Sequence, residues 1–175
     1  MKQVVIIGIF VVLLAGFASG HSFTGKVTRV VDGDTICVQT FVPFATFCSK
    51  SCIRVRLAEI DAPEKKQSFG LESRAALAEK IYGKTVRIDF TRKDRYGRII
   101  GHIFLASNPV NPVKKPSSLN SINAQMIRDG FAWWYRKYSK DNNLSELETT
   151  ARHQNRGLWT AKNPTAPWHY RRMRK

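Results

Sequence analysis

The chain has 175 residues, 43% of them apolar and 11% aromatic, a composition that excludes an intrinsically disordered protein and fits one globular domain. Lysine and arginine number 29 against 13 aspartate and glutamate residues, which gives a net charge of +16. This charge attracts polyanions, and nucleic acid is the usual one; anionic lipid and heparin-like polymers are the alternatives that charge alone leaves open.

The first twenty residues have the pattern of a secretory signal peptide. Lys2 supplies a positive start, an uncharged apolar run covers 4–17, and small residues at 18–20 end the segment. The apolar run is short for a membrane span, so a retained anchor is the weaker alternative. We therefore expect an exported protein, periplasmic or secreted, that is not attached to a membrane once residues 1–20 are removed.

Alternating apolar and polar residues predict five short strands. They fall in the segments 23–39, 53–60, 84–91 and 98–105. The first of these segments holds two strands, which are joined by a tight turn at Asp32-Gly33. A loop over 40–52 and another over 107–118 separate the strands from their neighbours.

Helical spacing predicts three helices, over 68–82, 121–129 and 144–156, each followed by a glycine within two residues. Ser68 is the candidate cap of the first helix. The strands and helices together predict an α+β single domain: a closed antiparallel barrel of five strands, of the OB type, with three helices packed outside. This domain is expected to cover 21–161, and the basic tail 162–175 is expected to be loosely ordered.

The chain has three cysteines, Cys37, Cys48 and Cys52. In an oxidising compartment two of them can pair, and the spacing does not choose among the three pairings. A zinc site is the rival interpretation, but three cysteines without a nearby histidine match zinc spacing poorly.

Few carboxylates are present in so basic a chain, and four of them cluster at two turns. Asp32 and Asp34 flank a glycine, and Asp61 and Glu64 flank Ala62-Pro63 at the end of a predicted strand. If the strands are neighbours, Asp34 and Asp61 converge. Oxygen ligands of this kind suit calcium or magnesium, whereas either turn alone is more often structural.

Two arginines lie beside these turns in the sequence. Arg56 is on the strand that leads to Asp61, and Arg98 follows the turn Asp94-Arg95-Tyr96-Gly97. A guanidinium binds phosphate through two parallel hydrogen bonds and stays charged at any working pH. Beside a dication, such a pair can hold a phosphodiester and stabilise the charge of its transition state.

Three segments in order resemble the signatures of the thermonuclease family, whose best-known member is staphylococcal nuclease. They are Val31-Asp32-Gly33-Asp34-Thr35, Arg56-Leu57-Ala58-Glu59-Ile60-Asp61-Ala62-Pro63-Glu64 and Asp94-Arg95-Tyr96-Gly97-Arg98. The later stretch 127–132 is similar to the family helix that leads into an aromatic-rich loop. The resemblance covers about 23–159, and three motifs at compatible spacing are specific where one would not be.

The resemblance implies a role for each matching residue. Asp34, Asp61 and the backbone carbonyl of Ala62 correspond to the calcium ligands, and Glu64 to the residue that orients or deprotonates the attacking water. Arg56 and Arg98 correspond to the pair that grips the scissile phosphate. Tyr96 and Tyr138 correspond to aromatics near the nucleotide.

The implied activity is endonucleolytic cleavage of DNA and RNA, with calcium and little sequence preference, to leave 3′-phosphate ends; a monomer is expected. Two features depart from the family pattern: Ala62 stands where the best-studied member has threonine, and the aromatic segment 133–138 reproduces the family's tyrosine pair only in part. Those aromatics either stack on bases or pack the barrel.

Two alternatives to an enzyme remain. A non-catalytic exported module of the OB type would bind nucleic acid without cutting it, and a basic protein could bind cell-surface polyanions. Because uncompensated carboxylates repel phosphate, a binding module has no need of Asp34, Asp61 and Glu64. The complete set favours the enzyme.

Overall fold

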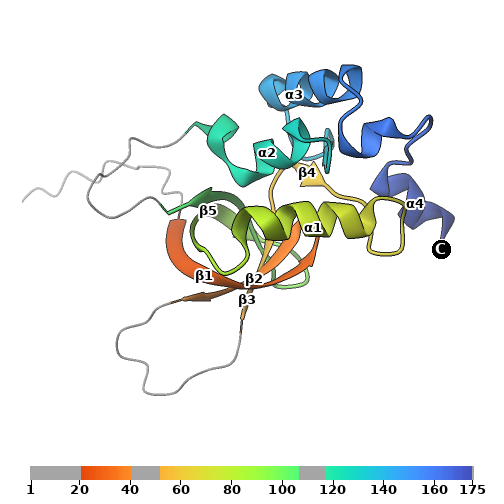
Figure 1. Cartoon of the computed structure of the whole chain (residues 1–175). Coiled ribbons are helices and arrows are strands. Elements are labelled where there is room, and N and C mark those ends of the chain that lie inside the picture. Colours follow the sequence, from red (N-terminus) through yellow and green to blue (C-terminus); the bar gives the residue numbers. More distant parts are fainter. Residues whose placement is uncertain (1–20, 41–51, 107–116, 175) are drawn as a thin grey trace, which may run out of the picture.

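The protein is described here by a computed structural model that covers residues 21–40, 52–106 and 117–174 (Figure 1). The predicted signal peptide at 1–20, most of the two predicted loops and Cys48 lie outside the described residues. Within the described ranges, none of the helices has the length and apolar character needed to cross a membrane.

Five strands close into the predicted OB-type barrel, in the order β1-β2-β3-β6-β5. Their bounds are β1 His21–Asp32, β2 Thr35–Thr40, β3 Ile53–Leu57, β5 Thr85–Lys93 and β6 Ile99–Leu105. The α+β prediction is confirmed, with one correction: the barrel is not wholly antiparallel, because β3 and β6 run parallel. A helix and β5 lie between them in the chain, and a connection of that length lets β6 return in the direction of β3.

The barrel is filled by β-branched side chains that point inward at alternate strand positions. Seven residues that share this interior are fully excluded from solvent: Val27, Ile36, Val38, Val55, Val86, Ile88 and Ile103. Branched side chains suit a pleated, buried surface, and their burial is the main stabilising contribution of the domain. The barrel therefore provides a rigid frame for the residues at its strand ends.

Helices and short segments complete the described domain, as the ribbon in Figure 1 shows. Their bounds are β4 Ile60–Asp61, α1 Gly70–Ile81, η1 Ser118–Asn120, α2 Ile122–Arg128, β7 Trp133–Trp134, α3 Asn142–His153, η2 Gly157–Thr160 and α4 Pro167–Met173. The predicted cap at Ser68 is wrong: α1 starts after Phe69, which has φ 64° and offers no side-chain bond. Ser121 and Asp141 do cap α2 and α3, each accepting a bond from a backbone amide.

The predicted third strand, 53–60, is divided in two. β3 ends at Leu57, Glu59 adopts φ 65°, and β4 then pairs with β7 in a second, two-stranded sheet. The left-handed residue turns the chain out of the barrel. As a consequence Asp61 lies beside the aromatic segment at 133–134 rather than on a barrel strand.

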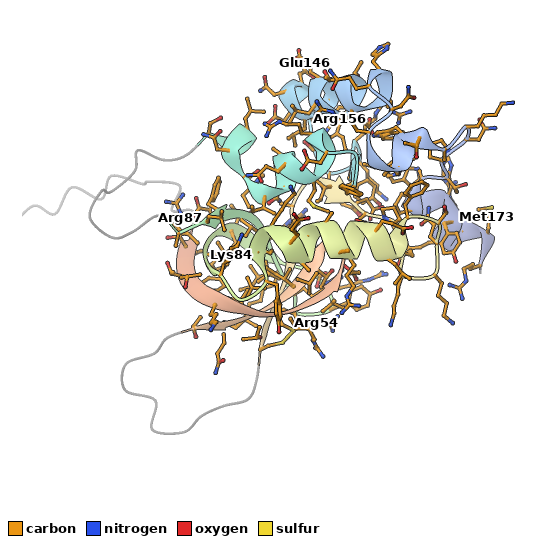
Figure 2. All side chains as sticks on the ribbon, viewed as in Figure 1. Arg54, Lys84, Arg87, Glu146, Arg156 and Met173 are labelled. Atoms are coloured by element: carbon orange, nitrogen blue, oxygen red, sulfur yellow. A yellow bond between two sulfur atoms is a disulfide. The ribbon has the colours of Figure 1, made fainter. Side chains whose placement is uncertain are left out.

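The C-terminal tail is ordered, contrary to the expectation of a loose segment, and it supplies a fourth helix. Pro167 occupies the first turn of α4, where its missing amide costs nothing, and Ala166 and Pro167 are buried. The helix packs beside the loop that follows β4, while its last residue, Met173, points to solvent (Figures 1 and 2). Residues 162–174 therefore belong to the folded unit.

A disulfide joins Cys37 to Cys52, with a Cα–Cα distance of 5.2 Å. It connects the middle of β2 to the residue before β3 and so closes the loop between these paired strands. Closing a loop of this length, 15 residues, stabilises a fold by about 3 kcal/mol in the chain-entropy account. This pairing resolves the choice that the sequence left open.

Candidate active site

The first carboxylate of the site is fixed by the turn between β1 and β2. Asp34 is 4% exposed; its amide donates to Asp32 Oδ1 at 3.1 Å, and its Oδ1 accepts from Thr35 Oγ1 at 3.0 Å. The turn lies so close to α1 that a Cβ on Gly33 would come 1.9 Å from Ser73 Oγ. Only glycine fits that approach, which explains the Asp-Gly-Asp sequence.

Arg56 joins the two predicted metal-binding carboxylates. Its Nη1 lies 2.7 Å from Asp34 Oδ1 and its Nη2 lies 2.8 Å from Asp61 Oδ1. The Ala62 amide donates to Asp34 Oδ2 at 3.0 Å. The structure thus brings Asp34 together with Asp61 and Ala62, which lie much later in the chain, and Arg56 bridges the two carboxylates. We call Asp34, Arg56 and Asp61 the base of the site.

A second arginine, Arg171 of α4, reaches the same carboxylates, and the sequence analysis missed it. Its Nη2 lies 2.6 Å from Asp61 Oδ2, and its Nη1 lies 3.2 Å from Asp61 Oδ1 and 2.7 Å from Glu64 Oε1. The tail carries several arginines and no motif, so nothing in the pattern distinguished this one. Glu64 is therefore held beside Asp61 by a residue 107 positions later in the chain.

Arg98 is held by the turn that precedes it. Asp94 Oδ1 accepts from the amides of Tyr96 and Arg98, at 2.9 and 3.0 Å, and Asp94 Oδ2 lies 2.7 Å from Arg98 Nε. Partial burial acts to raise the pKa of Asp94, but the hydrogen bonds from Arg98 and Tyr96 outweigh it and lower that pKa. Asp94 therefore stays ionised and anchors Arg98 through Nε, which leaves the Nη edge for another anion.

The predicted residues face one cleft of about 1310 Å³. Its lining includes the following predicted residues: Asp34, Arg56, Ala62, Glu64, Tyr96, Arg98 and Tyr138, together with Arg171. Asp61 does not line it, because its side chain is fully buried behind the two guanidinium groups. The cleft is large enough for a nucleotide-sized ligand.

Some aromatic residues of the segment after α2 pack in the core, and others line the cleft. Trp133 is 8% exposed and packs edge-to-face on Trp159, with ring centroids 4.4 Å apart, so it is a core residue and offers no surface to bases. Tyr135 and Tyr138 line the cleft. The packing interpretation therefore holds for Trp133, while base stacking stays a prediction for the residues that line the cleft.

Two exposed tyrosines and three cations form what we call the rim of the site: Tyr96, Tyr138, Arg92, Arg95 and Lys137. Tyr96 is 65% exposed and Tyr138 52%. Arg95 lies 4.8 Å from the Tyr96 ring centroid; Arg92 and Lys137 lie 5.9 and 5.6 Å from that of Tyr138. Flat rings next to positive charge suit a polyanion that carries stacking bases.

Buried charges at and beside the base shift the pKa values of their neighbours. Burial and the neighbouring charge of Asp34 raise the pKa of Asp32 to about 6. Burial by itself would lower the pKa of Arg56, but Asp34 and Asp61 together raise it. The guanidinium of Arg56 therefore stays charged between the two carboxylates.

The donor set at the base fits a hard divalent cation. Asp34 and Asp61 bring carboxylate oxygens together, and among the described residues their hydrogen-bond donors are Thr35, Arg56, Arg171 and the Ala62 amide, with no histidine or cysteine. Within the described ranges no three acidic, histidine or cysteine side chains form a cage, so a bound ion would take its other ligands from water or substrate. Ions such as calcium and magnesium bind in this way.

Comparison with known proteins identifies the family. The family model described as "Staphylococcal nuclease homologue" matches residues 54–161. The chain is 39% identical, over 167 residues, to a protein named micrococcal nuclease from Shigella flexneri, covering 94% of this chain and 90% of that protein. It is 40% identical, over 147 residues, to an uncharacterized endonuclease of Escherichia coli, with 84% of each chain covered.

The similarity extends to a staphylococcal-like nuclease of Arabidopsis thaliana, which is 34% identical over 122 residues; these make up 70% of this chain and 34% of the plant protein. The matched region contains the base of the site except Asp34, and it ends before α4. The barrel, the order of the motifs and these matches agree, and the chain belongs to the family of staphylococcal nuclease homologues.

Proposed function

We propose that the protein is an exported, calcium-dependent endonuclease that hydrolyses phosphodiester bonds of DNA and RNA with little sequence specificity and leaves 3′-phosphate ends. The observation that carries this proposal is the convergence of Asp34 and Asp61 on Arg56 in a cleft with a cationic, aromatic rim. Family membership and relatives named as nucleases support nuclease activity in general.

The chemistry assigned to the base begins with the metal. Asp34, Asp61 and the carbonyl of Ala62 would hold the calcium ion, which supplies Lewis-acid stabilisation of a phosphate oxygen when bound. Arg56 lies between the same carboxylates and so is placed to donate to the phosphate next to that position. Charged donors of this kind stabilise the negative charge that builds on phosphorus.

Glu64 is the candidate for handling the water proton. Its side chain is half-buried, lines the cleft and lies next to the carboxylate pair through the shared Arg171. In this mechanism Glu64 orients the water or accepts its proton, and the water attacks phosphorus in line with the 5′-oxygen; the bond from phosphorus to that oxygen breaks, and the departing oxygen takes up a proton from solvent. Cleavage on that side leaves the phosphate on the 3′-end. Arg98, which also lines the cleft, donates to the phosphate through its Nη edge while Asp94 holds its Nε.

Export is supported by two features of the chain. Residues 1–20 have the composition of a signal peptide, and the Cys37–Cys52 disulfide is of a kind that persists in oxidising compartments. We propose a periplasmic or secreted location and a monomer that requires no membrane.

The test is a digestion assay on the purified protein without residues 1–20, with single- and double-stranded DNA and with RNA. We expect cleavage with calcium, none with excess chelator, and 3′-phosphate ends on the fragments. The Glu64→Gln variant should cleave about 10²- to 10⁴-fold more slowly while it binds oligonucleotide with little change. Binding without cleavage by the unmodified protein would favour the non-catalytic module, and cleavage in chelator would refute the calcium role.

A further inference from the structure

The C-terminal helix places a guanidinium directly on two residues of the proposed mechanism. Arg171 forms a two-pronged contact with Asp61, Nη1 to Oδ1 at 3.2 Å and Nη2 to Oδ2 at 2.6 Å, and its Nη1 also bonds Glu64 Oε1 at 2.7 Å. One planar group therefore fixes the relative position of a buried carboxylate and a half-exposed one. Such a fork sets geometry as well as charge.

The helix that carries Arg171 is docked by contacts that do not involve the arginine. Trp168 stacks on Tyr135, with ring centroids 5.3 Å apart and planes 1° from parallel, and meets Trp133 edge-on at 5.6 Å. Gln67 donates to the carbonyl of Thr165 at 2.6 Å. The position of α4 is therefore set by packing against the aromatic segment and the loop after β4.

Tyr170 also ties α4 to that loop, since its hydroxyl bonds the Lys66 carbonyl at 3.0 Å. Glu64 belongs to the same loop, and apart from Arg171 no described side chain forms an ion pair with it. Its backbone amide is held by Gln67 Oε1 at 3.1 Å, but the carboxylate itself depends on Arg171 for its direction. Without the arginine, the half-exposed Glu64 side chain would be free to sample other rotamers.

We propose that Arg171 is a positioning residue of the active site, contributed by a helix outside the region matched by the family model, which ends at residue 161. It holds the Glu64 carboxylate beside Asp61 in the orientation that water activation needs, and it bonds both oxygens of Asp61, sharing Oδ1 with Arg56. This inference rests on the proposed nuclease function. Residues that orient the direct ligands or bases of a site typically affect activity about 10- to 100-fold when they are replaced.

The experiment compares Arg171→Ala with Arg172→Ala, an equal loss of charge at the next position of α4, whose exposed side chain lies outside the cleft lining. We expect Arg171→Ala to lower kcat about 10- to 100-fold with KM changed less than about threefold, and Arg172→Ala to match the unmodified protein. Added guanidinium ion, at millimolar concentrations that do not unfold the chain, should restore part of the activity of Arg171→Ala.

A double-mutant cycle shows whether the effect passes through Glu64. In the Glu64→Gln background, Arg171→Ala should cost much less than it does alone, because the group it positions is already disabled. The Trp168→Ala variant, which keeps the arginine but removes the stacking contact, should lower kcat in the same way. If Arg171→Ala does not fold, as judged by circular dichroism, Arg171→Lys keeps the charge without the fork and should lose kcat to a lesser extent.

The outcomes separate the two proposals. Absence of cleavage by the unmodified protein would refute the nuclease function itself. Cleavage by the unmodified protein with equal rates in Arg171→Ala, or additive effects in the cycle, would overturn the role of Arg171 alone. A faster Arg171→Ala variant would likewise overturn it, because it would show that the guanidinium obstructs the carboxylates.

Discussion

The base and the rim of the cleft differ in how deeply their side chains are buried and in what holds them. At the base, Asp61 is fully buried and Asp34 is 4% exposed, and their oxygens are held by arginines from β3 and α4. At the rim, Tyr96 and Tyr138 are more than half exposed and lie beside cationic side chains. Strand β3, the β4–β7 pair and helix α4 together fix the geometry of the base, whereas Tyr96 and Tyr138 of the rim lie in turns.

This difference predicts which substitutions affect folding and chemistry and which affect only substrate binding. A change at the base removes a partner from a buried ion and so affects both folding and chemistry. A change at the rim leaves the fold intact and weakens substrate contacts that water can partly replace. Function at the base thus requires exact placement of charge, while the rim requires only a surface of the right sign and flatness.

The largest effect is expected for Asp61→Asn at the base. The substitution takes the negative charge from between Arg56 and Arg171 and removes a proposed calcium ligand. We expect cleavage to fall by about 10³-fold and the melting temperature to drop, since two guanidinium groups lose their shared anion. Kinetics and calorimetry measure both. Glu146→Gln, on the outer face of α3 (Figure 2), is the matched control and should change neither.

Normal cleavage and normal calcium dependence of the Asp61→Asn variant would contradict the assignment of the base. It would place the metal elsewhere in the cleft, and the contrast between base and rim would then be one of stability alone.

A pair of arginine substitutions separates folding from chemistry. Arg56→Met removes the group that bridges two carboxylates, so it should lower the free energy of unfolding by about 2–3 kcal/mol as well as cleavage by about 10²-fold. Arg98→Met breaks a single ion pair with Asp94. It should lower cleavage by a similar factor but lower the free energy of unfolding by less than about 1 kcal/mol. Urea unfolding and cleavage rates, measured on both variants, test the contrast. Equal losses of stability would contradict it.

The base was largely predictable from sequence because its acids lie in turns of recognisable composition. Asp-Gly-Asp between two alternating segments predicts a turn, and Asp-Ala-Pro-Glu after a third predicts a strand end. The strand pattern also predicts the closed barrel, since five short strands together with helices are the make-up of the OB-type fold. What this pattern does not contain is strand direction, and so the parallel pairing of β3 with β6 was missed.

The contribution of α4 could not be predicted, for a physical reason. Seven residues with one buried position carry too short an apolar period to indicate a helix, and their arginines look alike in sequence. The helix depends on tertiary packing of Trp168 against Tyr135, a contact across 33 residues of chain that no local signal encodes. The same holds for the division of roles between Trp133 and Tyr138.

Replacement of the rim tyrosines is expected to have a smaller effect. Tyr96→Ala and Tyr138→Ala remove exposed rings that lie under cations and not in the core. Each should weaken binding of a single-stranded oligonucleotide by about 1–2 kcal/mol, with melting temperature unchanged, because base stacking on an aromatic side chain contributes on that scale. Fluorescence anisotropy in chelator measures this binding. Tyr82→Ala, an exposed tyrosine just after α1, is the control; an equal loss there would show a nonspecific effect.

The smallest effect concerns the cost of burying Asp32, which lies beside the base, next to the charge of Asp34. Because the pKa of Asp32 is about 6 in the folded protein and 3.8 ordinarily, the folded chain binds this proton more tightly than the unfolded chain. The free energy of unfolding therefore decreases as pH rises from about 4 through 6, and ionised Asp32 destabilises the fold above that range. Asp32→Asn keeps an oxygen acceptor for the Asp34 amide and removes the charge.

Asp32→Asn should therefore raise the free energy of unfolding at pH 7.5 by about 1 kcal/mol, after allowance for the solvent that reaches this half-buried side chain, and leave it unchanged at pH 4. Urea titrations at both pH values, with chelator present so that no cation offsets the acidic charge, make the comparison. A gain in the free energy of unfolding of equal size at pH 4 would show that the amide acts through hydrogen bonding. It would contradict a destabilising effect of the Asp32 charge.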